Sequence, residues 1–146
     1  MRLALLSLAL LMGCATTLLE QDIRRQSDGW TLTFHKLADG PNGFTNNGGM
    51  NFIPADGERL LWVTLTVRND ARSSRQFTFD SCGLDGDATY LPVYVGMNLG
   101  TQAMVTKTPS LDGGEEITRK LAFGYPKGRF PEHLICFGNE ISLKRQ

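Results

Sequence analysis

The residues of this chain that could perform acid–base or nucleophilic chemistry are few and scattered. Its two histidines, His35 and His133, fall on the polar face of one expected strand and at the start of another. No serine lies in the Gly-x-Ser-x-Gly turn that exposes a nucleophile. Glu115 and Glu116 are better explained as a solvated strand start than as an acid–base pair. The sequence therefore predicts no catalytic residue and a non-enzymatic protein.

Groups that bind metal ions are present but are not clustered. Copper carriers of the cell envelope use methionine and histidine, and the candidates here are Met50, Met97, Met104, His35 and His133. Met97 and Met104 are seven positions apart in an irregular segment, so packing explains these methionines better. We expect no metal and no cofactor at these side chains.

Two further patterns resemble ligand loops only in part. Asp80, Asp85 and Asp87 lack the 12-residue spacing and terminal glutamate of a calcium loop, and a turn explains Asp85-Gly86-Asp87. Gly113-Gly114 is followed by no expected helix, so it is not a phosphate loop.

The first fourteen residues combine a positive charge, an apolar run and a cysteine. Arg2 precedes a run of ten residues, 3–12, that is apolar except for Ser7, which is the layout of a secretory signal peptide. The run is too short to span a bilayer, which takes about 20 apolar residues. Its end, Leu11-Met12-Gly13-Cys14, resembles the bacterial lipobox, although alanine or serine is commoner at the position of Met12. The resemblance implies that Cys14 receives a diacylglyceryl group and that cleavage removes residues 1–13; the alternative is an ordinary signal peptide that contains a cysteine.

Length and charge restrict the partners of the mature chain. Removing residues 1–13 leaves 133 residues, enough for one domain with a core. Only Arg2 is lost among the charged residues, which leaves 14 basic and 15 acidic side chains. No basic surplus indicates a nucleic-acid partner, so the membrane contact would come from the lipid on Cys14. Ala15 in place of aspartate implies the outer membrane under the sorting rule of many Gram-negative bacteria.

Cys82 and Cys136 are the two cysteines that remain once Cys14 is modified. An exported chain meets an oxidising compartment, so we predict a disulfide between them. A reactive or metal-binding thiol pair would lack the usual Cys-x-x-Cys spacing, and two separate buried thiols are the remaining alternative. Each cysteine shares a strand face with a leucine expected in the core, Leu84 or Leu134.

The apolar residues of the remaining chain, which must form the core that positions the polar side chains and the cysteines, recur with a period of two. This period indicates strands. Strands are expected at 29–37, 59–68, around Phe77 and Phe79, and at 89–95, 117–126, 134–137 and 141–143. Val63, Leu65 and Val67 should be among the most buried residues, with Phe79 and Leu121 facing them. Short strands separated by turns predict an all-β fold, an antiparallel β-sandwich of about seven strands; a small closed barrel is the alternative.

Several motifs together resemble a bacterial Ig-like extracytoplasmic family of unknown function that is common in lipoproteins. The motifs are the alternating strand ending at Asn69, the Phe77 and Phe79 strand, Leu84-Asp85-Gly86-Asp87 with Tyr90, 111–115 and 121–126. The family pattern has proline where this chain has Asp112. The resemblance covers roughly residues 29–137 and implies an Ig-like sandwich, but it brings no catalytic residue.

The 38–58 segment is long for a loop and carries apolar residues, including Phe44, Phe52 and Ile53. Trp62 lies opposite the aliphatic stripe of its strand, on the outer face of the sheet. We expect the segment to fold back and cover Trp62. In the alternative, Phe44, Phe52 and Trp62 form an exposed partner surface.

The sequence thus predicts a signal peptide (1–13), a lipidated tether (14–28) and an Ig-like β-sandwich domain (29–146). The function expected is that of a lipid-anchored, periplasm-facing envelope protein that acts as an accessory or interaction module for another envelope protein. The alternatives are a small-ligand or metal-binding lipoprotein, with a concave pocket beneath the long loops, and an inhibitor of an envelope protease or hydrolase, with a rigid exposed loop.

Overall fold

A computed structural model describes residues 17–19, 21–46, 48–97 and 105–143 of the chain. Seven of its strands have four or more residues: β2 (Ile23–Ser27), β3 (Trp30–Asp39), β6 (Glu58–Asn69), β9 (Pro92–Met97), β11 (Glu116–Pro126), β12 (His133–Cys136) and β13 (Asn139–Ser142). The shorter strands are β1 (Thr17–Leu19), β4 (Phe44–Thr45), β5 (Asn51–Phe52), β7 (Arg75–Gln76), β8 (Cys82–Leu84) and β10 (Ser110–Leu111). No helix in these ranges is long and apolar enough to cross a membrane.

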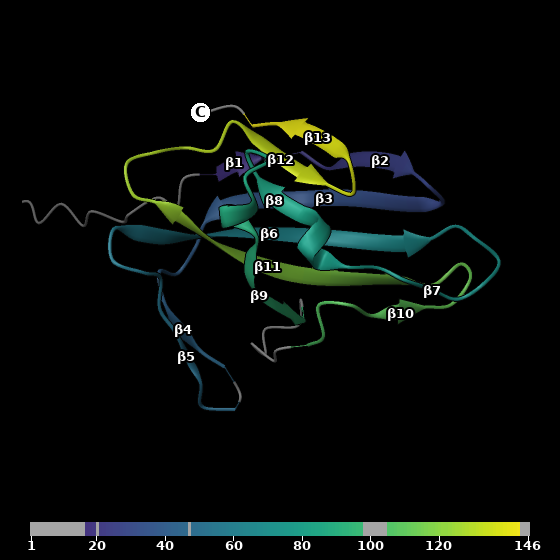
Figure 1. Cartoon of the computed structure of the whole chain (residues 1–146), viewed down its shortest axis with the longest axis horizontal. Coiled ribbons are helices and arrows are strands. Elements are labelled where there is room, and N and C mark those ends of the chain that lie inside the picture. The colour runs from purple at the N-terminus through teal and green to yellow at the C-terminus, as the bar shows by residue number, and fades with distance from the viewer. Residues whose placement is uncertain (1–16, 20, 47, 98–104, 144–146) are drawn as a thin grey trace, which may run out of the picture.

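Two antiparallel sheets form the sandwich (Figure 1). The larger sheet has the order β1-β3-β6-β11-β9, with β2 also paired to β3. The smaller sheet, β13-β12-β8, packs on one face of it, and side chains of both sheets share one buried core. Both sheets are open, so the predicted antiparallel β-sandwich is confirmed and the closed barrel is not formed.

Strand β6 is the centre of the fold because it pairs with β3 on one side and β11 on the other. From Val63 to Arg68 its apolar residues alternate with polar ones, and the inward residues Val63, Leu65 and Val67 are at most 2 % exposed. Phe79 and Leu121 are fully buried in the same cluster. The predicted core is therefore confirmed.

The N-terminal boundary differs from the prediction, because strands begin well before residue 29. Asp28 and Gly29 have φ of 52° and 74°, which suits a tight two-residue hairpin turn, and β2 pairs with β3 across it. β1 then pairs with the second half of β3, Thr17 opposite Ala38. Residues 17–19 and 21–27 thus belong to the domain and not to a tether, while the signal peptide and Cys14 lie outside the described residues.

Two of the predicted strands are partly replaced by 3-10 turns. Phe77 and Phe79 are buried as expected, but Phe79 begins the turn η1 (Phe79–Ser81), and the turn η2 (Ala88–Tyr90) precedes β9. In each turn a side chain just before it accepts a backbone hydrogen bond: Thr78 from Asp80 N and Asp87 from Thr89 N. Such local bonds compete with strand pairing.

Candidate binding surfaces and the disulfide

Trp62 lies in an aromatic cluster on the outer face of the larger sheet, with Leu60, Tyr94 and Ala122. The hairpin β4–β5 covers it: the ring centroid of Phe44 is 5.0 Å from that of Trp62, and Phe52 stacks on Phe44 at 4.8 Å. The Trp62 indole donates a hydrogen bond to Pro41 O at 3.2 Å, and the residue is only 5 % exposed. The 38–58 segment therefore covers Trp62, which is not an exposed anchor.

Ile53 behaves differently from the two phenylalanines. It follows Phe52, the last residue of β5, and lies outside the paired part of the hairpin. Ile53 is 78 % exposed and Met50, near the hairpin tip, is 52 % exposed. Phe44 and Phe52 are thus the cover, and Ile53 is left at the surface.

Removing the cover should change the fluorescence of Trp62. Phe44→Ser with Phe52→Ser is expected to red-shift the tryptophan emission and to increase its quenching by acrylamide, because the indole becomes hydrated. Trp30, the other tryptophan, is 1 % exposed among Phe77 and Phe137 in the main core and should contribute a constant signal. The control Ile53→Ser alters the same hairpin without uncovering Trp62, so its spectrum should match the wild type. Unchanged spectra for the double variant would mean that the hairpin does not shield Trp62.

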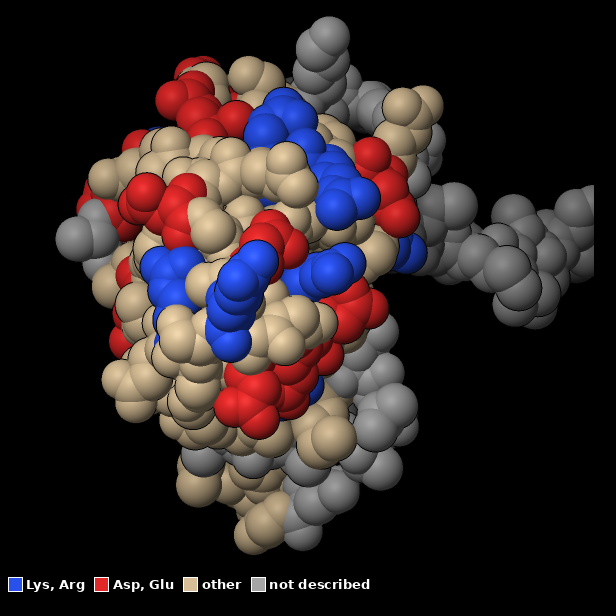
Figure 2. Space-filling model, turned by 90° about the vertical axis from the view of Figure 1, so that its right-hand side faces the viewer, with Lys and Arg blue, Asp and Glu red and all other residues tan. Residues whose placement is uncertain are grey.

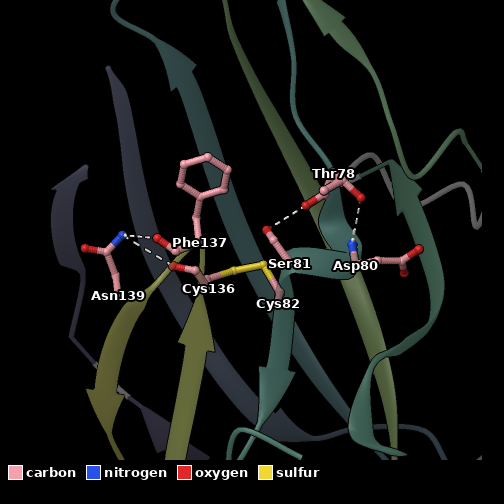
Figure 3. Close-up of a disulfide and its surroundings, with 7 residues drawn as sticks. All are labelled: Thr78, Asp80, Ser81, Cys82, Cys136, Phe137 and Asn139. Atoms are coloured by element: carbon pink, nitrogen blue, oxygen red, sulfur yellow. Dashed lines mark hydrogen bonds between the residues drawn. A yellow bond between two sulfur atoms is a disulfide. The ribbon is translucent and has the colours of Figure 1, made fainter. Parts of the chain in front are cut away.

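Cys82 and Cys136 form a disulfide between directly opposed positions of β8 and β12 (Figure 3). Their Cα atoms are 4.0 Å apart, and both residues are buried in the main core. Nearby backbone groups are held by side chains: Ser81 Oγ donates to Thr78 O at 2.7 Å, and Asn139 Nδ2 donates to Cys136 O at 3.3 Å. The predicted disulfide is therefore confirmed, and it joins two strands of one sheet rather than the two sheets.

The two histidines lie on different sheets, each beside a carboxylate. His35 Nε2 is 2.8 Å from Thr66 Oγ1, and its Nδ1 is 3.0 Å from Asp22 Oδ2. His133 Nδ1 is 2.7 Å from Glu140 Oε1 on β13. The structure thus does not bring the histidines together.

The predicted acidic candidates also have separate structural partners. Asp80 pairs with Lys107 at 3.1 Å, whereas Asp87 accepts the backbone hydrogen bond of Thr89, which lowers the pKa of its carboxyl group. Within the described ranges, no three His, Cys, Asp or Glu side chains are placed to share a metal ion. Met50 lies in the connection between β4 and β5, Met97 ends β9, and Met104 is outside these ranges.

Asp85 is the centre of a polar pocket of about 430 Å³ at one end of the sandwich. Its carboxylate accepts hydrogen bonds from the Tyr125 hydroxyl at 2.6 Å and from the backbone N–H groups of Glu132 and His133 at 2.7 and 3.0 Å. Burial, and then the bond to Asp85, raise the pKa of Tyr125 far above its usual value. Arg129 and Phe130 complete the lining. Both carboxylate oxygens of Asp85 accept hydrogen bonds from groups of the protein itself. Asp85 therefore has a structural role, which is to fix the 127–132 connection.

Asn69, the last residue of β6, organises the opposite end of the molecule. The residue is fully buried, and its side-chain amide donates to three carbonyls, Ser73 O at 2.8 Å, Leu111 O at 3.0 Å and Asp112 O at 3.3 Å. Its side-chain oxygen accepts from Ala71 N at 3.0 Å. One buried side chain therefore ties the 70–74 loop to the 111–115 loop, and we call these two loops the Asn69 platform.

Backbone contacts also hold the two loops of the Asn69 platform together. Asn69 N donates to Glu115 O, and Gly114 N donates to Asn69 O. Gly113 lies so close to the Arg72 carbonyl that a Cβ at this position would clash with it. The only sequence signal for this arrangement is a polar asparagine at the end of an apolar strand, followed by a turn.

The exposed surface of this end carries both signs of charge. Arg72, Asp112 and Glu115 of the platform are exposed. Figure 2 views the molecule from this end and shows basic and acidic side chains interleaved across it. A surface of this kind favours a partner with a matching charge pattern over a uniformly charged polymer.

Comparison with known proteins supports the fold. No family model and no curated protein matches the chain. It is similar in structure to an uncharacterized β-sandwich protein from Clostridium difficile 630, with a TM-score of 0.50 and 11 % identity over 81 % of this chain and 86 % of that one. At this identity the likeness shows a β-sandwich fold.

Proposed function

We propose that this chain is a non-enzymatic lipoprotein of the cell envelope, anchored through Cys14, whose Ig-like sandwich faces the periplasm from the outer membrane and binds another envelope protein. The lipobox at residues 11–14 supports the anchor. The buried Cys82–Cys136 disulfide supports an oxidising compartment, because such bonds persist outside the cytosol. The motifs of the Ig-like extracytoplasmic family, common in lipoproteins, fit the same assignment.

The Asn69 platform is the observation that carries the interaction role. Loops usually lose conformational freedom when they bind, and this loss weakens binding. Here both loops are already fixed from beneath by Asn69, while Arg72, Ser73 and Asp112 remain exposed. A pre-organised surface with charged groups of both signs suits specific recognition of a protein partner.

The same geometry favours one second candidate, an inhibitor of an envelope protease or hydrolase. Such inhibitors present a rigid exposed loop to the enzyme's cleft, and the 70–74 loop is exposed and braced by Asn69 at Ser73 O and Ala71 N. The two candidates differ in their partner: an enzyme whose cleft is blocked, or an envelope protein whose activity persists in the complex.

Photocrosslinking in cells tests the interaction role. A photoreactive amino acid at Ser73 or Asp112, both exposed on the platform, should give covalent adducts with one defined protein. The control position is Glu140, which is exposed on β13 of the smaller sheet. Adducts at Glu140 but not at the platform would contradict the assignment, whereas an enzyme inhibited in the adduct would favour the second candidate.

The anchor is tested by the mass of the protein in the membrane fraction. We expect a chain that begins at Cys14 and carries acyl groups, and we expect Cys14→Ser to lose them because serine lacks the thiol that is alkylated. Met12→Ala, which brings the lipobox closer to its common form, should leave the mass unchanged. An unacylated mature wild-type protein, or one that retains residues 1–13, would contradict lipidation.

A further inference from the structure

We propose that the sandwich is held end-on against the bilayer, with the 54–57 and 127–129 loops and Ile53 facing the lipid headgroups. We call this end the anchor end. The proposal rests on acylation of Cys14 and adds to it a defined orientation and a lipid-facing surface.

The covalent chain sets the first constraint. Thr17 is three residues after Cys14, and an extended chain spans at most about 3.6 Å per residue, so the two Cα atoms are at most about 11 Å apart. Thr17 is itself fixed in the larger sheet, opposite Ala38 of β3. The lipid is therefore attached almost directly to the folded domain, with no long spacer between them.

Strand pairing then identifies which end is attached. β3 ends at Asp39, next to Ala38, and Asp39 pairs with Leu61 near the start of β6. Glu58, the first residue of β6, pairs with Pro126, the last of β11. The attachment point thus lies at the end where β3 and β11 finish and β6 begins, and Figure 1 shows β1 and the connection after β11 at this same end.

The anchor end is braced so that its loops move with the domain. Lys127 N donates to Gly57 O at 2.9 Å, which joins the two loops. Arg59 is ion-paired with Asp39 and donates to Arg129 O at 2.6 Å. If the lipid anchor orients the domain relative to the bilayer, these two loops are therefore oriented with it.

The exposed chemistry of the anchor end suits a headgroup layer. The two loops carry two exposed cations, Lys127 and Arg129, and one exposed acid, Asp56, and cations bind lipid phosphates. Ile53 supplies an apolar side chain that is 78 % exposed. Each contact is weak, but the covalent anchor raises the local concentration of lipid enough for weak contacts to be occupied.

The Asn69 platform lies at the far end of the same strands. β6 runs from Glu58 to Asn69, and the 11 steps between these residues, at a rise of about 3.3 Å each, span roughly 36 Å. An end-on orientation therefore places the platform roughly 36 Å from the anchor end, facing away from the bilayer. In a side-on orientation the exposed edge strand β2, with Arg24 and Arg25, would instead contact the lipid.

The test uses the acylated mature protein, which begins at Cys14, in vesicles of phosphatidylethanolamine and phosphatidylglycerol that contain a lipid with a nitroxide on its headgroup. With Cys14 acylated and Cys82 bonded to Cys136, a single introduced cysteine can be labelled with a fluorophore. Three exposed positions are compared: Lys127→Cys at the anchor end, Gln26→Cys on the β2 edge and Ser73→Cys on the platform.

We expect quenching by the nitroxide lipid to be several-fold stronger at position 127 than at positions 26 and 73. Equal quenching at all three positions, or the strongest quenching at 26 or 73, would overturn the end-on orientation. Flotation of the vesicles tests the anchor separately from the orientation. A protein that does not float with the vesicles would refute acylation at Cys14, on which the orientation depends. Quenching at 127 that persists in Cys14→Ser would also overturn the proposal, since the anchor would then not set the orientation.

Discussion

Replacing Cys82 and Cys136 together by alanine is expected to lower the free energy of unfolding by about 4 kcal/mol. The bond closes a loop between residues 54 positions apart, and in the chain-entropy model a loop of this length restricts the unfolded chain by about that amount. Both residues are fully buried, so the lost packing of the sulfur atoms adds to the effect. The measurement is urea denaturation of a soluble form covering residues 15–146, with and without the two substitutions.

The denaturant dependence separates the two contributions. An unfolded chain without the cross-link is more expanded, so the slope of the free energy against urea should rise in the double variant. A packing defect alone would leave this slope unchanged. A loss of less than about 1 kcal/mol would mean that the bond does not constrain the unfolded chain as the model assumes.

Asn69→Ala is expected to cost about 3 kcal/mol and to loosen both loops of the platform. Three carbonyls lose the amide that they share, and Ala71 N loses its acceptor. Only the bond to Leu111 O is fully buried, and an unpaired buried polar group costs about 1–3 kcal/mol, whereas water can partly replace the others. Hydrogen exchange should show faster exchange at Ala71 N, together with the drop in stability.

Two further substitutions define what Asn69 supplies. Asn69→Asp keeps an acceptor for Ala71 N but sets a carboxylate against the carbonyls of Ser73, Leu111 and Asp112, so it should cost at least as much as alanine. The matched control is Asn139→Ala, because that partly buried amide also donates to two backbone carbonyls, at 3.3 and 3.2 Å, but fixes no pair of loops. It should cost less than about 1 kcal/mol. Equal losses for Asn69→Ala and Asn139→Ala would remove the special role of Asn69.

The sequence predicts the parts of this fold that depend on repeated alternation. In β6 the aliphatic residues on one face are enough to locate a central strand, because burial on one side imposes a period of two. The same alternation places Trp62 on the outer face, and an apolar segment next to it in the sequence supplies the cover found at Phe44 and Phe52. The Cys82–Cys136 disulfide follows from the number of cysteines and from the export that the sequence predicts.

The parts that were missed depend on single residues or on pairing with distant strands. β2 has mainly exposed side chains, so only the Asp28-Gly29 turn marks the hairpin that adds it to β3. β1 is three residues long and is stabilised by β3, from which it is separated in the sequence. The role of Asn69 depends on carbonyls about 40 positions away, which no local pattern reveals.

The order of the strands along the chain has a consequence for biosynthesis. Every strand of the larger sheet is complete by Pro126, whereas β12 and β13 of the smaller sheet begin at His133 and Asn139. β8 meets its partner β12 only after about 50 further residues have emerged, so the apolar face of the larger sheet stays uncovered until then. A nascent chain stopped before residue 133 is thus a half-built sandwich with an open hydrophobic face, the kind of intermediate that chaperones bind.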